Sequence, residues 1–462
     1  MNYFNPNDTI CAISTPIGEG GISIVRLSGP QAIEIAESIC RINKASLSSI
    51  PTHTIRYGKI VYNNETIDEV LINVQRKPRS FTKEDIVEIN THGGIILTKK
   101  ILDILIDKGA RLALPGEFTK RAFLNGRIDL LQAEAVLSII KSKTDLGTKT
   151  ALQHLEGHFS FYVNKTKEQL IKLLSHIEAF INFPDEDTDI FSNIRLESEF
   201  EEILNSLSKI IATYKSGEVI REGVHTVLVG KTNVGKSSLL NTFLNRDRAI
   251  VSKYPGTTRD ALEELIEIGG ILFRVVDTAG IIPSPRHELD YLSVEKTRQH
   301  YAKGDLILFI LDGSRPIDDE DRNIYNEIKD KKFIIVINKN DLTSCIDSNE
   351  VNEWCSDEQN ILKISVVTKE GVSDLEKKMV QYVWGGSRSN NEIIITRVRH
   401  KKALEKSFRH IENAFDIFKK KGSVELLAYD IRDALDAIRE LIGEVYSEDV
   451  LNLIFSEFCI GK

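Results

Sequence analysis

Three mainly apolar runs, separated by longer mixed segments, mark the middle of the chain. The runs are Val224–Val229, Leu306–Leu311 and Phe333–Ile337. Apolar runs of roughly 4–8 residues are typical of strands that are buried on both faces. The intervening segments are long enough for helices, and strands that alternate with helices favour a parallel sheet covered on both sides. We therefore predict an α/β domain with a mostly parallel sheet at residues 217–384.

Apolar residues recur at helical spacing on both sides of this domain. Before it, the spacing is found in Leu130–Leu137 and Leu170–Phe180. After it, one broad apolar stripe with charges opposite is formed by Leu427, Ile431, Leu435, Ile438, Leu441, Ile442 and Val445. The simplest packing joins residues 121–216 and 385–462 into one discontinuous helical bundle, into which the α/β domain is inserted.

Residues 1–120 follow a third pattern, in which short strand-like segments are interrupted by helix-like ones. The helix candidates are Pro30–Ile39 and Ile95–Lys108. The strand candidates are Thr9–Ile13, Ile22–Leu27, Ile55–Val61, Val70–Val74 and Ile86–Asn90. The fold class is thus a multidomain α/β plus α protein that begins with a mixed α/β domain.

Composition narrows the environment and the partners. Net charge is −8, so contact with nucleic acid has to come from local basic patches and not from the overall charge. The apolar runs are too short to span a bilayer, and the N-terminus has no signal-peptide core. The five cysteines form no CxxC pair and no zinc spacing, which is typical of reduced thiols in a cytoplasm. We expect a cytoplasmic protein that has no membrane contact.

The strongest chemical motif follows the first apolar run. Residues 230–237 read GKTNVGKS and fit the phosphate-binding pattern GxxxxGK[ST]. A strand, a glycine loop and a helix N-terminus let backbone N–H groups and the helix dipole bind a polyphosphate. Lys236 is expected to contact the β- and γ-phosphates of the nucleotide, and Ser237 is expected to bind Mg²⁺.

Three further motifs favour a guanine nucleotide. Residues 338–341 (NKND) follow a predicted strand, and Asp341 can accept hydrogen bonds from the N1–H and the amine of guanine. Residues 277–280 (DTAG) place a carboxylate near the metal and a glycine amide near the γ-phosphate, and residues 256–260 (GTTRD) offer a threonine to the metal.

The fifth GTPase motif is only partly present, because Ser365-Val366-Val367 stands where Ser-Ala-Lys is usual. Backbone contacts tolerate such changes, so we expect guanine specificity to survive. The predicted GTP-binding residues are Asn233, Val234, Gly235, Lys236, Ser237, Ser238, Ser252, Lys253, Tyr254, Pro255, Gly256, Thr257, Thr258, Asp277, Thr278, Ala279, Gly280, Asn338, Lys339, Asp341 and Ser365.

Three other segments have ordinary interpretations when each is taken alone. Residues 16–21 (PIGEGG) fail the GxGxxG spacing and favour a tight strand connection over a ligand loop. The basic run Arg397–Lys402 favours a solvated helix face over an RNA groove. The ending FCIGK at 458–462 does not fit a prenylation box, since it closes on lysine, and favours a frayed tail with a buried thiol.

In combination, these features resemble the MnmE (TrmE) family of tRNA-modification GTPases over essentially the whole chain. The most specific marks are the inserted GTPase domain with NVGKSS, GTTRD and DTAG, and the C-terminal Cys-x-Gly-Lys. Supporting motifs are Pro16–Arg26, Glu88–Gly94, Pro115–Thr119 and Arg127–Glu134.

The resemblance implies a folate site and several partners. Members dimerise through the N-terminal domain and bind 5-formyltetrahydrofolate or a related folate there. With the flavoprotein MnmG, in a heterotetramer or larger complex, they add a carboxymethylaminomethyl-type group at C5 of the tRNA wobble uridine. Carried over by position, Arg26, Arg127 and Lys462 suit the folate carboxylates, and Glu88 suits the pterin N–H groups. Cys459 matches the family cysteine and acts either in the chemistry or only in folding.

The resemblance also implies that potassium assists GTP hydrolysis. Ile281 follows DTAG, so the water-orienting glutamine of Ras-like enzymes is missing. In this family an asparagine of the phosphate loop binds K⁺ in place of an arginine finger. The expected metal ligands are Asn233, Ser252, Tyr254 and Thr257 for K⁺, and Ser237 and Thr258 for Mg²⁺.

The water-orienting carboxylate departs from the family pattern. The family has a glutamate at a position where this chain has Asp290, with Glu288 two residues earlier as the reserve candidate. Aspartate reaches about 1.5 Å less, which matters where catalytic geometry must hold to about an ångström. Two other functions would share the potassium loop, namely a ribosome-assembly GTPase and a purely regulatory switch. No segment reads as an appended RNA-binding module, and the folate residues argue against a pure switch.

Overall fold

The structure is a computed structural model that describes residues 5, 7–43, 45–182, 194–246, 263–277, 304–355, 360–384 and 393–462. The described residues pack into two compact units. The first comprises Met1–Ile140, Leu152–Ile203 and Lys406–Lys462, and the second comprises Lys141–Ala151 and Leu204–Glu405. None of the helices in this part of the chain is both long and apolar enough to span a membrane.

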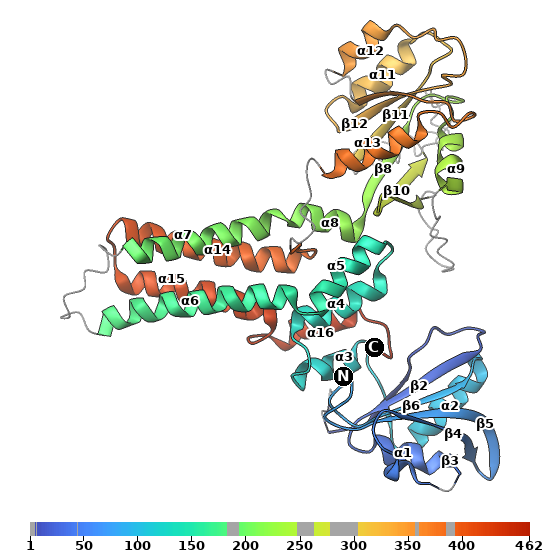
Figure 1. Ribbon diagram of the computed structural model, residues 1–462, viewed down its shortest axis with the longest axis vertical. Coiled ribbons are helices and arrows are strands. Elements are labelled where there is room, and N and C mark those ends of the chain that lie inside the picture. The colour runs from blue at the N-terminus through green and yellow to red at the C-terminus, as the bar shows by residue number, and fades with distance from the viewer. Residues whose placement is uncertain are drawn as a thin grey trace, which may run out of the picture. The chain divides into compact units, whose positions relative to one another are not determined.

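The N-terminal region contains a seven-stranded sheet in the order β3-β4-β5-β6-β2-β1-β7. Neighbouring strands are antiparallel except for β1 and β7, which are parallel. The strands are β1 (Ile10–Ile13), β2 (Ile22–Ser28), β3 (Cys40–Ile42), β4 (Thr54–Tyr62), β5 (Glu65–Gln75), β6 (Ile86–His92) and β7 (Arg111–Leu112). Helices α1 (Ala32–Ile39) and α2 (Ile95–Asp107) lie on one face of this sheet (Figure 1).

Alternation along the strands gives the sheet one covered and one partly open face. Inward residues of β5 and β6, such as Ile72 and Ile89, are fully buried in the core with α1 and α2. Outward residues such as Tyr57 and Leu71, which pair across β4 and β5, are about half exposed. The turn between these strands places Asn63 and Asn64 at φ 49° and 64°, which is the left-handed geometry that two-residue hairpins require.

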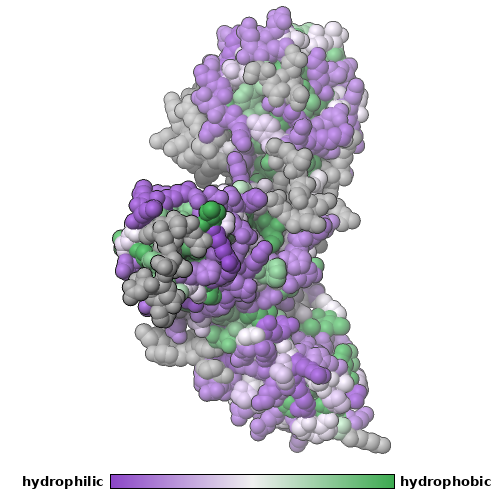
Figure 2. Space-filling view, turned by 60° about the vertical axis from the view of Figure 1, so that its left-hand side comes forward, coloured by the Kyte–Doolittle hydropathy of each residue, from purple (hydrophilic) through white to green (hydrophobic). Residues whose placement is uncertain are grey.

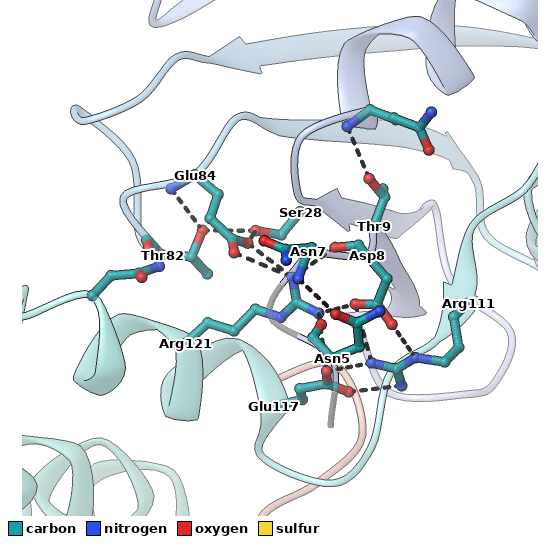
Figure 3. Close-up of polar contacts among 12 residues, drawn as sticks. Asn5, Asn7, Asp8, Thr9, Ser28, Thr82, Glu84, Arg111, Glu117 and Arg121 are labelled. Atoms are coloured by element: carbon teal, nitrogen blue, oxygen red, sulfur yellow. Dashed lines mark hydrogen bonds and ion pairs between the residues drawn. The ribbon is translucent and has the colours of Figure 1, made fainter. Parts of the chain in front are cut away.

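A buried network of charges fixes helix α3 (Glu117–Leu124) to the ends of the sheet (Figure 3). The guanidinium of Arg121 is 1% exposed and donates to the carboxylates of Asp8, Glu84 and Glu117. Arg111 reaches Glu117 and Asp8, each at 2.6 Å. Burial alone would raise the pKa of Asp8, but the two arginines outweigh it and hold this pKa below its usual value. The position of α3 is therefore determined by several directional ion pairs.

The second sheet has six strands in the order β13-β12-β11-β8-β10-β9. All of its pairs are parallel except β9 with β10, in agreement with the predicted fold class. The strands are β8 (Val224–Val229), β9 (Glu263–Ile268), β10 (Ile271–Asp277), β11 (Leu306–Asp312), β12 (Phe333–Asn338) and β13 (Ile361–Lys363). Apolar cores lie on both faces of this sheet. Its helices are α9 (Lys236–Arg246), α11 (Asp319–Ile328), α12 (Ser348–Trp354) and α13 (Val372–Trp384).

Eight further helices belong to the described chain. They are α4 (Leu130–Lys141), α5 (Asp145–Leu155), α6 (His158–Asn182), α7 (Ile194–Ala212), α8 (Tyr214–Glu222), α14 (Val398–Lys419), α15 (Val424–Ile442) and α16 (Glu448–Ser456). Helices α6 and α15 pack along each other, and the rings of Phe200 and Phe415 stack between α7 and α14. The described surface that faces the viewer in Figure 2 is mostly hydrophilic, with scattered hydrophobic residues.

The predicted apolar stripe of α15 is buried except at its end. Six of its seven residues, from Leu427 to Ile442, are buried, but Val445 is half exposed. The helix ends at Ile442 because Gly443 adopts φ 80° and its N–H bonds the carbonyl of Arg439. The prediction was therefore wrong for Val445, which lies beyond the helix. The expectation of a solvated face at Arg397–Lys402 also fails in part, since Arg397 and His400 are buried.

Candidate functional site: a phosphate loop and a docked C-terminal tail

Backbone geometry gives residues 230–237 the shape of a phosphate cradle. Gly230 and Gly235 have φ of 148° and 105°, which L side chains rarely adopt. A Cβ on Gly230 would lie 2.3 Å from the carbonyl oxygen of Ile310, and one on Gly235 would lie 2.2 Å from Nδ2 of Asn338. Helix α9 then begins within the loop, so its first N–H groups and its dipole face the cradle.

Lys236 folds back across this loop. Its Nζ donates to the carbonyl oxygens of Gly230 and Lys231 at 2.7 and 2.6 Å. Burial lowers the pKa of the Lys236 ammonium, although the carboxylate of Asp277 opposes the shift. A terminal phosphate would offer this ammonium anionic acceptors in place of two neutral carbonyls, so that both partners of each hydrogen bond would be charged.

A hydroxyl and a carboxylate converge where a metal is expected. Ser237 Oγ donates to Asp277 Oδ2 at 2.6 Å, which joins the start of α9 to the end of β10. The second oxygen of Asp277, Oδ1, is buried and has no hydrogen-bond partner among the described residues. Hard oxygen donors of this kind suit Mg²⁺, and an orphaned carboxylate oxygen is what a hydrated metal would satisfy. The residues present therefore fit the metal.

Asn338 ties the phosphate loop to the base-recognition motifs. Its side chain is buried and donates to the carbonyl of Val234 at 2.8 Å, while its Oδ1 accepts from the N–H of Val366 at 3.1 Å. Ser365 Oγ donates to Asp341 Oδ1 at 2.5 Å and so orients that carboxylate. Val366 contributes through its backbone, which explains how the departure from Ser-Ala-Lys is accommodated.

Two lysine contacts of this site are not evident from the sequence. Lys339 has φ 67° and its Nζ lies 2.6 Å from Asp312 Oδ2. Burial alone would raise the pKa of Asp312, but the hydrogen bonds from Lys339 and Ser314 hold it below its usual value. Lys231 lies 2.7 and 2.8 Å from Asp318 and Asp321, which form the capping box of α11. The spacing of Asp318 and Asp321 fits a helix capping box, but Asp318 lies 87 residues from Lys231, and the sequence carries no sign of this contact.

Several predicted residues lie outside the described part of the chain. These are Ser252, Lys253, Tyr254, Pro255, Gly256, Thr257, Thr258, Thr278, Ala279, Gly280, Glu288 and Asp290. Asn233, the predicted potassium ligand, is described; it is exposed and has φ 63°. Ser238 is exposed near the start of α9.

The C-terminal tail docks against the N-terminal sheet. Gly461 has φ 97°, and its carbonyl accepts from Ser14 Oγ at 3.2 Å and from Arg26 Nη1 at 3.3 Å. A Cβ on Gly461 would lie 2.3 Å from the carbonyl oxygen of Ile13. The N–H of Gly116 also bonds the carbonyl of Cys459, at 3.4 Å. The frayed tail with a buried thiol is thus a wrong interpretation: the tail is held, and the Cys459 side chain is exposed.

This docking brings three of the four predicted folate residues together. Arg26 and Glu88 are directly opposite on β2 and β6, and the guanidinium approaches Glu88 Oε1 at 2.8 Å. Asn73 donates to the other carboxylate oxygen of Glu88 at 3.1 Å, and the ring of Phe118 lies under Arg26. Burial, and then the charge of Arg26, lower the pKa of the nearby Lys462 ammonium. Two cations beside one carboxylate leave this site with positive charge for an anion.

Arg127 lies further along the same region. Its guanidinium rests over the ring of Phe81, 4.9 Å from the centroid. Phe81 in turn packs against the small apolar cluster that includes Phe118. The fourth predicted residue is therefore joined to the other three through aromatic packing, and no direct ion pair links it to them among the described contacts.

Two family models and several curated relatives match nearly the whole chain. Residues 9–127 match the family model for the GTP-binding protein TrmE N-terminus, and residues 130–459 match the MnmE helical domain. The tRNA modification GTPase MnmE of Acetivibrio thermocellus is 44% identical over 98% of this chain and 99% of its own, and that of Clostridioides difficile is 41% identical over 99% of both. A solved Aquifex aeolicus Era variant bound to GDP.AlF4⁻ is 28% identical over 40% of this chain and 66% of its own, with a TM-score of 0.30. Full-length identity at this level places the chain in the MnmE family of tRNA modification GTPases.

Proposed function

We propose that this protein hydrolyses GTP and, with the flavoprotein MnmG, adds a carboxymethylaminomethyl-type group at C5 of the tRNA wobble uridine. The one-carbon unit comes from 5-formyltetrahydrofolate or a related folate. The observation that carries the proposal is the docked tail, which places Lys462 beside the Arg26–Glu88 pair on a chain that also holds a complete phosphate loop. A GTPase with no substrate chemistry has no need of this second site.

Each region takes one part of this work. Residues 1–120 bind folate and dimerise, and residues 217–384 hydrolyse GTP. Residues 121–216 and 385–462, which lie before and after the GTPase domain in the chain, form the helical domain. The reaction takes place in the cytoplasm.

The nucleotide is held mainly by backbone groups of the phosphate loop and by Lys236. Ser237 and Thr258 would hold Mg²⁺, which would neutralise charge on the β- and γ-phosphates. Asn233 would hold K⁺, which would supply the positive charge of an arginine finger. Asp341, oriented by Ser365, selects guanine.

Water is oriented by Asp290 or, as the reserve candidate, by Glu288. Single-turnover hydrolysis in potassium is to be measured for Asp290→Asn and Glu288→Gln. An unchanged rate for Asp290→Asn would exclude Asp290 from this role.

The folate is recognised by charge. The Glu88 carboxylate accepts N–H groups of the pterin, while Lys462 and Arg127 attract the carboxylates of the glutamate. Arg26 supports both tasks, because it pairs with Glu88 and bonds the Gly461 carbonyl. Cys459 is exposed within the same tail, where a thiol is accessible to chemistry.

The homodimer forms through the open face of the N-terminal sheet. Ile22, Ile55, Tyr57 and Leu71 expose 63%, 58%, 54% and 45% of their surface there. An apolar face of this kind is typical of a protein interface. Size-exclusion chromatography of Tyr57→Asp with Leu71→Asp should give monomers if this face forms the dimer, and dimers would contradict it.

The decisive experiment for the function is mass spectrometry of wobble uridines. Cells that lack the gene should have unmodified wobble uridines in the affected tRNAs, and the full-length gene should restore the modification. Full modification in the deletion strain would refute the proposal. A ribosome-assembly role would instead appear as immature subunits with normal uridines.

A further inference from the structure

A basic hollow of about 350 Å³ lies beside Arg127 on the N-terminal domain. Its basic lining side chains are His53, Arg79, Lys83 and Arg127, and this set is called the basic hollow below. Neither aspartate nor glutamate is among its lining residues in the described chain. A concave surface that gathers basic groups and lacks acidic ones attracts an anion.

Strand geometry places one lining residue of the basic hollow close to the Arg26–Glu88 site. Gln75 lines the hollow, and Asn73, two residues earlier on β5, donates to Glu88. Side chains two residues apart on a strand point to the same face and are about 6.8 Å apart. A ligand bound at Glu88 therefore needs to extend only a short distance along this face to enter the hollow.

Aromatic packing gives a second connection. Phe81 lines the hollow and lies under Arg127, and it packs in the cluster of Phe118, which lies under Arg26. The two arginines thus rest on rings of one apolar cluster. Such stacking restricts each guanidinium while its N–H groups remain able to donate.

The basic side chains of the hollow keep N–H donors available for a ligand. The ammonium of Lys83 donates to the carbonyl of Gly126, the residue before Arg127, at 2.8 Å. An ammonium has three N–H donors, so two remain for a ligand. Arg79 and Lys83 are exposed, so a ligand can reach them from solvent. This arrangement suits a flexible ligand with several carboxylates spaced along it. A glutamate joined to the previous one through its γ-carboxyl adds one free carboxylate with every unit.

We propose that the basic hollow binds the γ-linked oligoglutamate extension of the folate, and that a polyglutamylated folate is the preferred substrate. This inference rests on the proposed function, since it requires the folate to bind at Arg26 and Glu88. Arg127 contacts the first glutamate, and Arg79 and Lys83 contact those that follow. Arg79 and Lys83, which are not among the four residues that the family resemblance identified, thereby give the protein its preference for the extended folate.

The test compares two ligands on the full-length protein. Isothermal titration calorimetry at low ionic strength measures 5-formyltetrahydrofolate with one glutamate and with five. The pentaglutamate should bind about three- to thirtyfold more tightly, the range that two exposed ion pairs provide. This ratio should fall towards one in the double variant Arg79→Gln, Lys83→Gln, and also in high salt.

A matched control separates the basic hollow from net charge. Lys99→Gln with Lys100→Gln removes the same charge from exposed positions on α2, which covers the other face of the sheet, and should keep the wild-type ratio. Equal binding of the two ligands by the wild-type protein would overturn the inference but not the proposed function. A preference that survives in the double variant would also overturn it. No binding of the monoglutamate at all would instead count against the folate part of the proposed function. If the double variant loses tRNA affinity and keeps the pentaglutamate preference, the hollow is a site for RNA phosphates and the inference is wrong.

Discussion

The phosphate loop and the tail site perform comparable physical tasks in different ways. In the proposed function, both hold an anion with a lysine and with backbone geometry that depends on glycine. In the phosphate loop, the glycines, the lysine and the helix start lie within eight residues of sequence, 230–237. In the tail site, Arg26, Glu88, Gly116 and Gly461 come from four distant segments and meet through strand register and tail docking. The first site is therefore encoded locally, and the second is encoded by the fold.

Substitutions should also impair the two sites in different ways. Loss of the phosphate-loop lysine removes a group that acts directly on the nucleotide. Damage at the tail site acts through position, because the contact of Arg26 with the Gly461 carbonyl holds Lys462 near the Arg26–Glu88 pair. The following changes, taken from the largest expected effect to the smallest, separate these two kinds of failure.

Replacement of Lys236 should have the largest effect. Lys236→Ala removes the ammonium that is poised over the loop, and GTP hydrolysis should fall by about 10²–10³, as for loss of one preorganised donor. Single-turnover hydrolysis measures this rate, and folate titration should be unchanged. The exposed Lys331→Ala is the charge-matched control. Loss of folate binding in Lys236→Ala would contradict the separation of the two sites.

A change at Asp341 tests base recognition. Asp341→Asn replaces an acceptor by a donor against guanine, and loss of charged hydrogen bonds should weaken GTP by about 100-fold. Xanthosine triphosphate, which offers an oxygen where guanine has its amine, should gain affinity. Nucleotide titration checks both values. Retained preference for GTP would show that another residue reads the base.

The docking glycine of the tail offers a positional test. Gly461→Ala places a Cβ against the Ile13 carbonyl at φ 97°, so the tail should detach and folate affinity should fall by at least about tenfold. GTP hydrolysis should be unaffected. Gly18→Ala is the matched control, because its Cβ would meet no atom within 4 Å. Normal folate binding by Gly461→Ala would show that the docked tail is not part of the site.

Deprotonation of Lys462 should have the smallest effect on folate affinity, and this effect depends on pH. Its pKa lies below the usual 10.5, mainly because of burial and also because of Arg26. Folate affinity should fall about three- to fivefold as pH rises through this lowered pKa and the ammonium is lost, while Lys462→Arg, which stays charged, should not show the fall. Since the pKa is lower in the docked state, deprotonation favours docking, and protease resistance of the tail should not decrease over this range. Identical pH profiles for the two proteins would remove Lys462 from the site.

The same contrast explains which features could be predicted from sequence. The run Val224–Val229 coincides with β8, and Leu306–Leu311 falls one residue short of β11, because strands buried on both faces leave a clear apolar signal. Strand β5 was predicted at Val70–Val74 but begins at Glu65, because polar residues at 65, 66, 68 and 69 leave its first half without an apolar run. The packing of Phe118 under Arg26 and the contact of Asn338 with Val234 depend on register between distant segments. A single sequence carries no local signal for such contacts.

The central claim is that the phosphate loop and the docked tail are separate sites that serve one modification reaction. The most direct measurement gives both readouts for Gly461→Ala: GTP hydrolysis by the purified protein, and mass spectrometry of wobble uridines from cells in which this variant replaces the wild type. We predict hydrolysis at the wild-type rate and wobble uridines that lack the carboxymethylaminomethyl-type group. Fully modified uridines in these cells, with the tail shown by proteolysis to be undocked, would contradict the account.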